Sequence, residues 1–479
     1  MHNQLGPHSP SIHILDDDSL LNVFYFCRPA PLYEDEVDYL RRGEWVRESW
    51  WYKFTHVCRR WRYLVHASAS HLRLCLICTY GTPVAEMLAH SPPLPLIIDH
   101  VDKAREITAE DEEGIILALQ HPDRVRRIRL LTPTPNLQKI ILAMDDEFPM
   151  LEYLSIVPLA KHVICLKLPK TFQAPHLRHL ILRNFAVPMR SALLTTAVGL
   201  VTLSLQWIHP SPYFRPNDML QRLSLMPQLE ILTIGFHLSD PNCELEVEMQ
   251  LLDTPLETHV TLPNLRWFGF GGVSAFLEAL LPQMTTPLLE KLEILFFNQL
   301  TFSIPHQLQF LRAGESLKFH NVVFRFSPRV LTMQVYPHRG AETCTLCMTV
   351  FRTHPGWLVT PAARIYDALR IAISAVEHIT LRYGSGFIPL EDQQNAADRT
   401  EWREILRSFG DLKTLRVVDD GFVTQVSHSL RPGDEESPME LLPELKELEY
   451  FSSGDAGDVF TSFINSRKKA GHLVTLVRR

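Results

Sequence analysis

Several signals that would assign this chain of 479 residues to a class of protein are absent from it. No apolar run approaches the ~20 residues that a membrane-spanning helix requires. The opening residues, MHNQLGPHSP, lack the basic and then apolar pattern of a secretion signal. The net charge of -7, with 21% charged residues, provides no general attraction to nucleic acid or anionic lipid. We therefore expect a cytoplasmic or nuclear protein with neither a nucleic-acid nor a membrane partner.

Motifs of common enzyme classes are also missing. The chain contains no GxSxG elbow, no GxxxxGK[ST] phosphate loop, no GxGxxG after a strand and no HExxH. Its 22 histidines could supply a base, but no motif combines one with a nucleophile or an oxyanion site. We predict that the protein is not an enzyme and that it has no catalytic residue and no cofactor.

The eight cysteines provide little evidence for a metal site. Most of them lie in apolar runs, where a free thiol packs as a small hydrophobic group. Two CxxC pairs occur, Cys75/Cys78 and Cys344/Cys347, and a zinc or redox site is their functional interpretation. Both pairs lie in segments that resemble strands, where residues three apart point to opposite faces. We therefore predict no metal site, and zinc or redox chemistry is the alternative.

A recurring apolar pattern is the main feature that the sequence does contain. Segments such as FPMLEYLSI, MPQLEILTI and LPELKELEY start at a proline and continue as LxxLxL. Recurrence about every 20–29 residues is typical of leucine-rich repeats, in which LxL forms a strand and the spacer returns as a helix or loop. The lead positions are Val125, Leu151, Leu177, Leu200, Leu229, Leu265, Leu289, Leu412 and Leu445.

The spacers between these segments have the apolar period of helices. Asn217 and Asp398 are suitable N-caps, and Gly410 follows a helix where a C-terminal glycine is common. The pattern blurs over 297–375, with fainter versions at Val330-Met333-Val335 and, just beyond, Val376-Ile379-Leu381. The helices are expected at 217–226, 272–284, 361–376 and 398–410.

These observations predict an α/β fold in which residues 79–479 form an irregular leucine-rich-repeat-like solenoid. An ordinary α/β domain with alternating strands and helices is the alternative. A solenoid exposes a broad surface and few deep pockets, which favours protein binding over catalysis. We expect residues 458–479 to form its C-terminal cap, as a helix, a turn at Gly471 and a strand from Leu473 to Val477. In this cap Arg467, Lys468 and Lys469 are expected in solvent at the end of the helix.

The strand-lined face of the solenoid is the predicted site for a protein substrate. Within each LxxLxL, the residue between the last two apolar positions points away from the core. Those residues form a row that is basic at first, small or aromatic in the middle and acidic at the end. An ordinary solvated face is the alternative interpretation. The row comprises Arg129, Ser155, Ile181, Ser204, Thr233, Gly269, Glu293, Arg416 and Glu449, and the predicted substrate-binding residues are Arg127, Arg129, His179, Arg183 and Trp267.

The N-terminal part has a different pattern of apolar residues. ILDDDSLLNVF and WWYKFTHVCRRWRYLV are apolar at helical spacing, yet each is too short to bury its apolar face alone. Asp16 to Asp18 are placed to cap the first helix. Arg59, Arg60 and Arg62 lie opposite the apolar stripe of the second, where we expect a solvated flank.

These two segments resemble the F-box, the short helical module that docks on the SKP-type adaptor of SCF ubiquitin ligases. The resemblance rests on Leu15, on SLLNVF at 19–24 and on HVCRRWRYLV at 56–65. The usual Leu-Pro start reads Leu15-Asp16 here, and an insertion at about 28–49 separates the first helix from the rest. The module is expected at residues 1–78. The resemblance implies an adaptor-binding set of Leu15, Leu20, Leu21, Phe24, Phe54, Val57, Cys58, Trp61 and Val65.

Downstream segments further resemble F-box proteins that are expanded in mushroom-forming fungi. They include 78–99, 398–421 and 460–477. The resemblance implies a substrate receptor that reaches a cullin through the adaptor and brings an unknown protein substrate to the ligase. The alternative is a leucine-rich-repeat interaction scaffold without a role in ubiquitin transfer.

Overall fold

The computed structural model describes most of the chain and divides it into two compact units, residues 1–200 and 201–479. Each unit is described by itself. The predicted boundary between module and solenoid near residue 78 lies inside the first unit and stays a prediction. The described residues are 15–28, 50–101, 105–159, 165–208, 215–237, 258–297, 306, 309–311, 319–327, 329–351, 359–369, 376–383, 399–431, 440–451 and 459–479.

The first unit begins with short helices whose starts are capped. The carboxylate of Asp16 accepts a hydrogen bond of 2.7 Å from the amide of Ser19, which confirms the expected capping role. The Cys58 thiol caps the later helix by accepting from the amide of Trp61 at 3.5 Å. Most of the insertion expected at 28–49 lies outside the described residues. The helices are α1 (Asp17–Phe26), α3 (Tyr52–Thr55), α4 (Arg59–Ala67) and α5 (Ala69–Leu72).

An aromatic cluster forms the core of these helices. The ring of Phe24 stacks on Phe54 at 5.0 Å and meets the edge of Trp61 at 4.9 Å. The guanidinium of Arg60 donates to the carboxylate of Asp17 at 2.7 Å and 2.9 Å, and so joins α4 to α1. Arg62 donates to the carbonyl oxygen of Thr55 at 2.8 Å. Arg59 and Arg62 are exposed, as expected of a solvated flank, whereas Arg60 is half-buried and pairs with α1.

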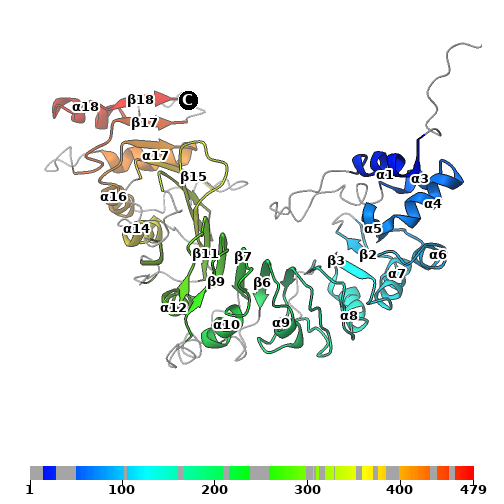
Figure 1. The fold of residues 1–479 in the computed structure, drawn as a ribbon. Helices are drawn as coiled ribbons and strands as arrows, with labels where there is room; N and C mark the ends of the chain where they lie inside the picture. Colours follow the sequence, from blue (N-terminus) through cyan, green and yellow to red (C-terminus); the bar gives the residue numbers. More distant parts are fainter. Residues whose placement is uncertain are drawn as a thin grey trace, which may run out of the picture. The chain divides into compact units, whose positions relative to one another are not determined.

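A parallel sheet follows in the first unit, with the order β1-β2-β3-β4-β5. Helices lie along one face of these strands (Figure 1). The strands expected at Val125, Leu151 and Leu177 are confirmed as β3, β4 and β5, and the extended segment expected around Cys75 and Cys78 is confirmed as β1, whereas β2 was not expected. The elements are β1 (Leu76–Cys78), α6 (Val84–His90), β2 (Leu96–His100), α7 (Ala109–Leu119), β3 (Val125–Thr132), α8 (Thr134–Leu142), β4 (Tyr153–Pro158), β5 (His179–Arg183) and α9 (Ala192–Thr196).

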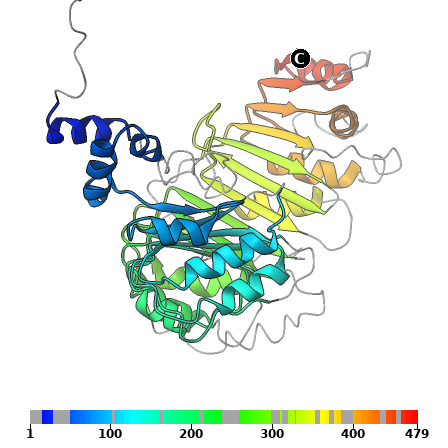
Figure 2. The same cartoon turned by 90° about the vertical axis from the view of Figure 1, so that its right-hand side faces the viewer.

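The second unit contains a mostly parallel sheet, and Figure 2 shows its later strands, coloured yellow to red, side by side. The order is β6-β7-β9-β11-β14-β13-β12-β15-β16-β17-β18, and β8 pairs with β10 separately. The strands are β6 (Thr202–Ile208), β7 (Ile231–Phe236), β8 (Val260–Thr261), β9 (Trp267–Gly272), β10 (Met284–Thr285), β11 (Lys291–Phe297), β12 (Asn321–Phe326), β13 (Val330–Tyr336), β14 (Leu346–Phe351), β15 (His378–Tyr383), β16 (Thr414–Val417), β17 (Glu447–Tyr450) and β18 (Thr475–Arg478).

One strand in this sheet, β13, breaks the parallel pattern. β13 pairs antiparallel with both β12 and β14, and these three lie between β11 and β15. Val330-Met333-Val335 therefore belongs to an antiparallel strand, and its interpretation as a faint repeat was wrong. Val376-Ile379-Leu381 leads into β15, which is parallel to β12 and β16. The apolar alternation of β13 resembles a repeat strand because a strand buries one face whatever its direction.

The helices of the second unit lie along one side of its sheet (Figure 1). α10, α12, α14 and α16 fall in the predicted spacers, whereas α17 was not expected. The start of α10 differs from the prediction, because its N-cap is Arg215 and Pro216 occupies the first turn ahead of Asn217. Asp398 lies outside the described residues. Among the described residues no helix is long and apolar enough to cross a membrane. The helices are α10 (Pro216–Leu223), α12 (Ser274–Leu280) with η2 (Leu281–Gln283), α14 (Val359–Leu369), α16 (Arg399–Ser408), α17 (Asp420–Leu430) and α18 (Thr461–Lys469).

The C-terminal segment has the expected order of helix, turn and strand. α18 is followed by Gly471, whose φ of 85° is in the left-handed region that favours glycine. β18 then pairs parallel with β17. Arg467 was expected in solvent but is completely buried, and it donates hydrogen bonds to the main-chain carbonyls of Leu441, Leu442 and Pro443. This prediction was wrong because the side chain turns inward to residues before β17, whereas Lys468 and Lys469 are exposed.

Candidate functional site

The residues predicted to bind an adaptor fall into three groups by their burial. Leu20, Phe24, Trp61 and Val65 are buried in the core of the helical module. Leu21, Phe54 and Cys58 are half-buried, and Leu15 and Val57 are exposed. Only the latter two groups are accessible to a partner without a rearrangement of the module.

The helical module also exposes other apolar side chains. Of the fifteen large hydrophobic side chains that are exposed in the described part of the chain, seven lie between Leu15 and Leu72. Of these seven side chains, the most exposed are Phe26 at 83% and Tyr63 at 73%. Concentration of such groups in one small region is typical of a surface that binds a partner. We call this set the module surface, and it comprises Leu15, Val23, Tyr25, Phe26, Tyr52, Val57 and Tyr63.

On the sheet of the first unit, two predicted substrate-binding residues meet a partner on a neighbouring strand. Arg127, Tyr153 and His179 are in register on β3, β4 and β5. The guanidinium of Arg127 lies 4.6 Å from the centre of the Tyr153 ring, and the imidazole of His179 lies 5.7 Å from the same ring. Arg183, the last residue of β5, is half-buried. The structure thus brings Arg127 and His179 together around a tyrosine that the sequence analysis did not select.

Arg129 is paired rather than available as a free cation. It is in register with Asp99 on β2 and donates to that carboxylate at 2.7 Å and 3.1 Å. The two side chains are only 13% and 10% exposed. Arg129 was predicted to bind a substrate, but its charge is already compensated inside the sheet. Asp99 was not predicted, because no repeat strand was recognised before Val125.

Trp267 lies at the start of β9 in the second unit. The Nζ atom of Lys291 lies 3.8 Å from the centre of its ring, from the in-register position on β11. The tryptophan, a predicted substrate-binding residue, is half-buried. The ammonium ion covers the ring because the neighbouring strand holds it at the distance of a cation–π contact.

The predicted row of outward residues is present as aligned positions within each unit. Arg129, Ser155 and Ile181 are in register, and so are Ser204, Thr233, Gly269 and Glu293. Several of these residues are nevertheless buried, including Ser155 and Ser204. Longer side chains on the same face cover the short ones, as Gln206 does when it donates to the Ser204 hydroxyl at 3.2 Å.

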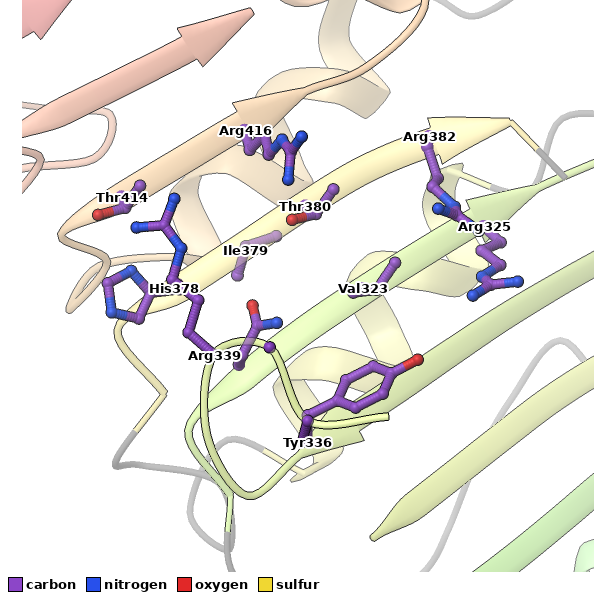
Figure 3. Close-up of a pocket in the computed structure, with 13 residues that line it drawn as sticks. Val323, Arg325, Tyr336, Arg339, His378, Ile379, Thr380, Arg382, Thr414 and Arg416 are labelled. Carbon is purple, nitrogen blue, oxygen red and sulfur yellow. The ribbon is translucent and has the colours of Figure 1, made fainter. Parts of the chain in front are cut away.

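The second unit contains a pocket of about 220 Å³ on the strands β12, β15 and β16. Arg325, Arg382 and Arg416 project from the three strands, and Arg339 approaches from the turn after β13 (Figure 3). Arg325 and Arg382 are directly opposite each other in the parallel pair β12 and β15. Among the described residues that line the pocket, none is acidic. The remaining lining residues are Asn321, Val323, Tyr336, Gly340, Ala341, His378, Ile379, Thr380 and Thr414.

One buried acidic residue, Glu449, lies beside this pocket and pairs with arginines of its wall. The carboxylate of Glu449 on β17 is 2.8 Å from Nη2 of Arg339, 3.7 Å from Nε of Arg416 and 3.4 Å from Nε of Arg479. Glu449 is 1% exposed, and three guanidinium groups surround its single carboxylate. Arg325 and Arg382 form no ion pair within the part of the chain that the structure describes. The pocket therefore carries an excess of positive charge.

Nitrogen atoms in the pocket wall also lack acceptors. Nε of Arg325, Nε of Arg382 and Nδ1 of His378 are buried and have no hydrogen-bond partner among the described residues. Burial, followed by repulsion from Arg325 and Arg416, holds the pKa of Arg382 below its usual range, against the effect of Tyr336 and Asp419. The pKa of His378 is lowered by burial first and then by His320 and Arg339, against Glu377 and Glu447. Arg325, Arg382 and His378 thus present buried donor nitrogens that no acceptor among the described residues satisfies.

A local signal for this pocket exists in the sequence. HITLRY in β15 alternates polar and apolar residues, NVVFRF in β12 does so except at Val323, and both place an arginine next to last. The same position in both strands becomes a facing pair because the strands pair in parallel. Sequence analysis had selected Arg416 as an outward residue, but it did not connect it with Arg325 or Arg382.

The CxxC pair Cys344/Cys347 lies near this sheet too. Cys344 precedes β14 and Cys347 lies within it, so the alternation of a strand does not separate them. A hydrogen bond between the two thiols lowers the pKa of Cys344 to about 7, with a further contribution from Lys291, against burial and Glu293. The argument that the two thiols must face opposite ways was therefore wrong. No group of three or more potential metal ligands occurs within the described residues.

Comparison with known proteins does not identify a family. No model of a protein family matches the chain, and no curated protein is detectably similar to it in sequence.

Proposed function

We propose that this chain is the substrate-recognition subunit of an SCF-type ubiquitin ligase. In this function the helical module binds a SKP-type adaptor, which connects it to a cullin, and the sheets hold a protein substrate. The adaptor raises the local concentration of the substrate near a ubiquitin-charged enzyme, so the chain itself needs no catalytic residue. The F-box resemblance of SLLNVF and HVCRRWRYLV is the basis for naming the adaptor.

The module surface is the observation that carries the proposal. Leu20, Phe24, Trp61 and Val65 already fill the core, yet seven large apolar side chains remain exposed on the same few helices. Exposed apolar groups at this density favour association, because burial stabilises by about 25 cal/mol for each Å² removed from water. A protein partner that covers them provides that burial.

The first test is co-purification of the full chain with a SKP-type adaptor. Val57→Arg and Leu21→Arg place a charge at accessible positions of the predicted contact set, and each is expected to weaken adaptor binding at least tenfold, since an interface core excludes an unpaired charge. Leu142→Arg is the matched control, because Leu142 is an exposed apolar residue at the end of α8, outside the module.

Its outcomes separate the two candidate functions. Loss of binding in the Val57 and Leu21 variants, with binding retained in the Leu142 variant, supports the receptor function. A folded wild-type chain that captures no SKP-type adaptor contradicts it, and an interaction scaffold without a link to ubiquitin then becomes the better proposal.

A further inference from the structure

We propose that the arginine-lined pocket of the second unit binds a phosphate monoester. This goes beyond the proposed function and does not depend on it, because the pocket lies wholly in residues 321–416 and its ligand can be measured without an adaptor. The argument rests on the placement of the arginines, the unpaired donors and the size of the pocket.

The placement of Arg325 and Arg382 is unfavourable unless an anion is present. Like charges directly opposite each other on adjacent strands destabilise a sheet. These two are in register, and no ion pair within the described residues compensates either of them. Arg416 lies on the next strand, in register with Thr380. An anion that bridges the three guanidinium groups converts their repulsion into attraction.

The chemistry of the donors favours phosphate over a carboxylate. Each guanidinium presents a planar fork of N–H groups, and one fork is sufficient for the two oxygens of a carboxylate. Here Arg325 and Arg382 lie toward one end of the pocket and Arg339 with His378 toward the other (Figure 3). A tetrahedral dianion has oxygens that accept from several directions at once, which matches donors on more than one side.

The rest of the wall supports a small polar ligand. The volume of about 220 Å³ is below the ~300–1,000 Å³ of common sites for larger organic ligands. Thr380 and Thr414 add hydroxyl groups, and Asn321 adds an amide. The ion pairs of Glu449 with Arg339 and Arg416 fix these two side chains, so part of the pocket wall is ordered before a ligand binds. Preorganised donors reduce the entropy lost on binding.

The experiment measures binding of inorganic phosphate, pyrophosphate and a short peptide with one phosphoserine to the full chain by calorimetry and by ³¹P NMR. Sulfate and acetate serve as anion controls. We expect at least one phosphorylated probe to bind tenfold or more tightly than acetate and to raise Tm by mass action. The Arg325→Gln/Arg382→Gln double variant is expected to lose tenfold or more in affinity.

Arg266→Gln is the matched control. Arg266 is an exposed arginine of the same unit that pairs with Glu290 at 2.9 Å away from the pocket, and its replacement is expected to leave affinity unchanged. Without ligand, the double variant is expected to melt no lower than wild type, because the repulsion is removed. If it does not fold, Arg382→Lys keeps the charge but loses the fork, and a several-fold loss of affinity is expected.

The probes also distinguish the source of the phosphate group. Tighter binding of the phosphopeptide indicates a phosphorylated side chain of a protein, and tighter binding of pyrophosphate or phosphate indicates a small molecule. Acetate bound as tightly as every phosphorylated probe overturns the proposal, and so does equal phosphate affinity in wild type and in the folded arginine variants. Neither outcome affects adaptor binding, so failure here is distinct from failure of the proposed function.

Discussion

The guanidinium of Arg467 donates a hydrogen bond of 2.7 Å to the carbonyl oxygen of Leu441, although the two residues belong to different segments of the chain. Arg467 is a residue of α18, and Leu441 precedes β17. The same side chain also donates to Leu442, whose φ of 53° is in the left-handed region. Arg467 thus ties the last helix to a strained turn and satisfies carbonyl groups that α18 would otherwise bury.

The first prediction follows from this contact. Arg467→Met leaves the buried carbonyl groups of 441–443 without donors, so we expect the free energy of unfolding to fall by roughly 2–4 kcal/mol. Lys468→Met is the control at an exposed neighbouring position, with a change within about 0.5 kcal/mol. Urea unfolding followed by tryptophan fluorescence measures both. Equal stability of the two variants would show that the Arg467 contacts contribute nothing.

A second prediction separates folding of the helical module from adaptor binding. Phe24→Ala and Trp61→Ala remove buried rings that contact each other at 4.9 Å, and each is expected to destabilise the module by about 3–5 kcal/mol. Limited proteolysis with mass spectrometry should then show rapid cleavage within 15–72. Tyr63→Ala removes an exposed ring of the same helix as Trp61 and should leave the pattern unchanged. Resistance of the Phe24 and Trp61 variants to cleavage would contradict the described core.

The third prediction concerns the ion pair of Asp99 and Arg129. Asp99→Ala leaves a mostly buried guanidinium without its carboxylate, so we expect a loss of about 3 kcal/mol in unfolding free energy. The Asp99→Leu/Arg129→Met double variant removes both charges and is expected to recover most of it, since apolar pairs often replace buried ion pairs at little cost. Chemical denaturation of the three proteins gives the comparison. Simple addition of two independent losses in the double variant would show that the residues are not coupled.

The fourth prediction uses the lowered pKa of Cys344. With a pKa of about 7, this thiol is about half ionised at neutral pH, and its ionised fraction rises little above pH 8. Burial raises the pKa of Cys165, which is therefore almost entirely protonated in the same range. Because the thiolate is the nucleophile, we expect iodoacetamide to modify Cys344 at least tenfold faster than Cys165 at pH 7. Peptide mass spectrometry over a pH series measures both rates.

A variant of the partner thiol tests the cause. Cys347→Ala removes the hydrogen bond that lowers the pKa of Cys344, so the midpoint of its reactivity should move to higher pH. An unchanged pH profile in the Cys347 variant would assign the reactivity to Lys291 or another neighbour instead.

The repeat strands could be predicted from sequence because their signal is local. In segments such as LEYLSI and LRWFGF, alternate apolar residues bury one face of a strand whatever lies beside it. Proline ahead of each lead residue ends the preceding helix, which places the start of the strand within a few residues. β2 was missed because its apolar run, LIIDH, is buried without alternation, and periodicity alone does not identify such a strand.

The arginine-lined pocket could not be predicted in the same way. It depends on the antiparallel strand β13, which returns the chain so that β12 becomes the neighbour of β15. Strand order of this kind is decided by pairing between distant segments. The arginines of NVVFRF and HITLRY can be read from the sequence, but the strand pairing that places them opposite each other cannot.

The amino-acid sequence by itself determined where strands and helices form, because the spacing of apolar residues, proline and capping groups acts within a few residues. Only the tertiary structure decided which charges meet. Arg129 finds Asp99 from 30 residues away, Arg467 turns into the protein instead of toward solvent, and Arg325 faces Arg382. The energy of a charge depends on its burial and on the partner opposite it, and both are set when separate strands come into register.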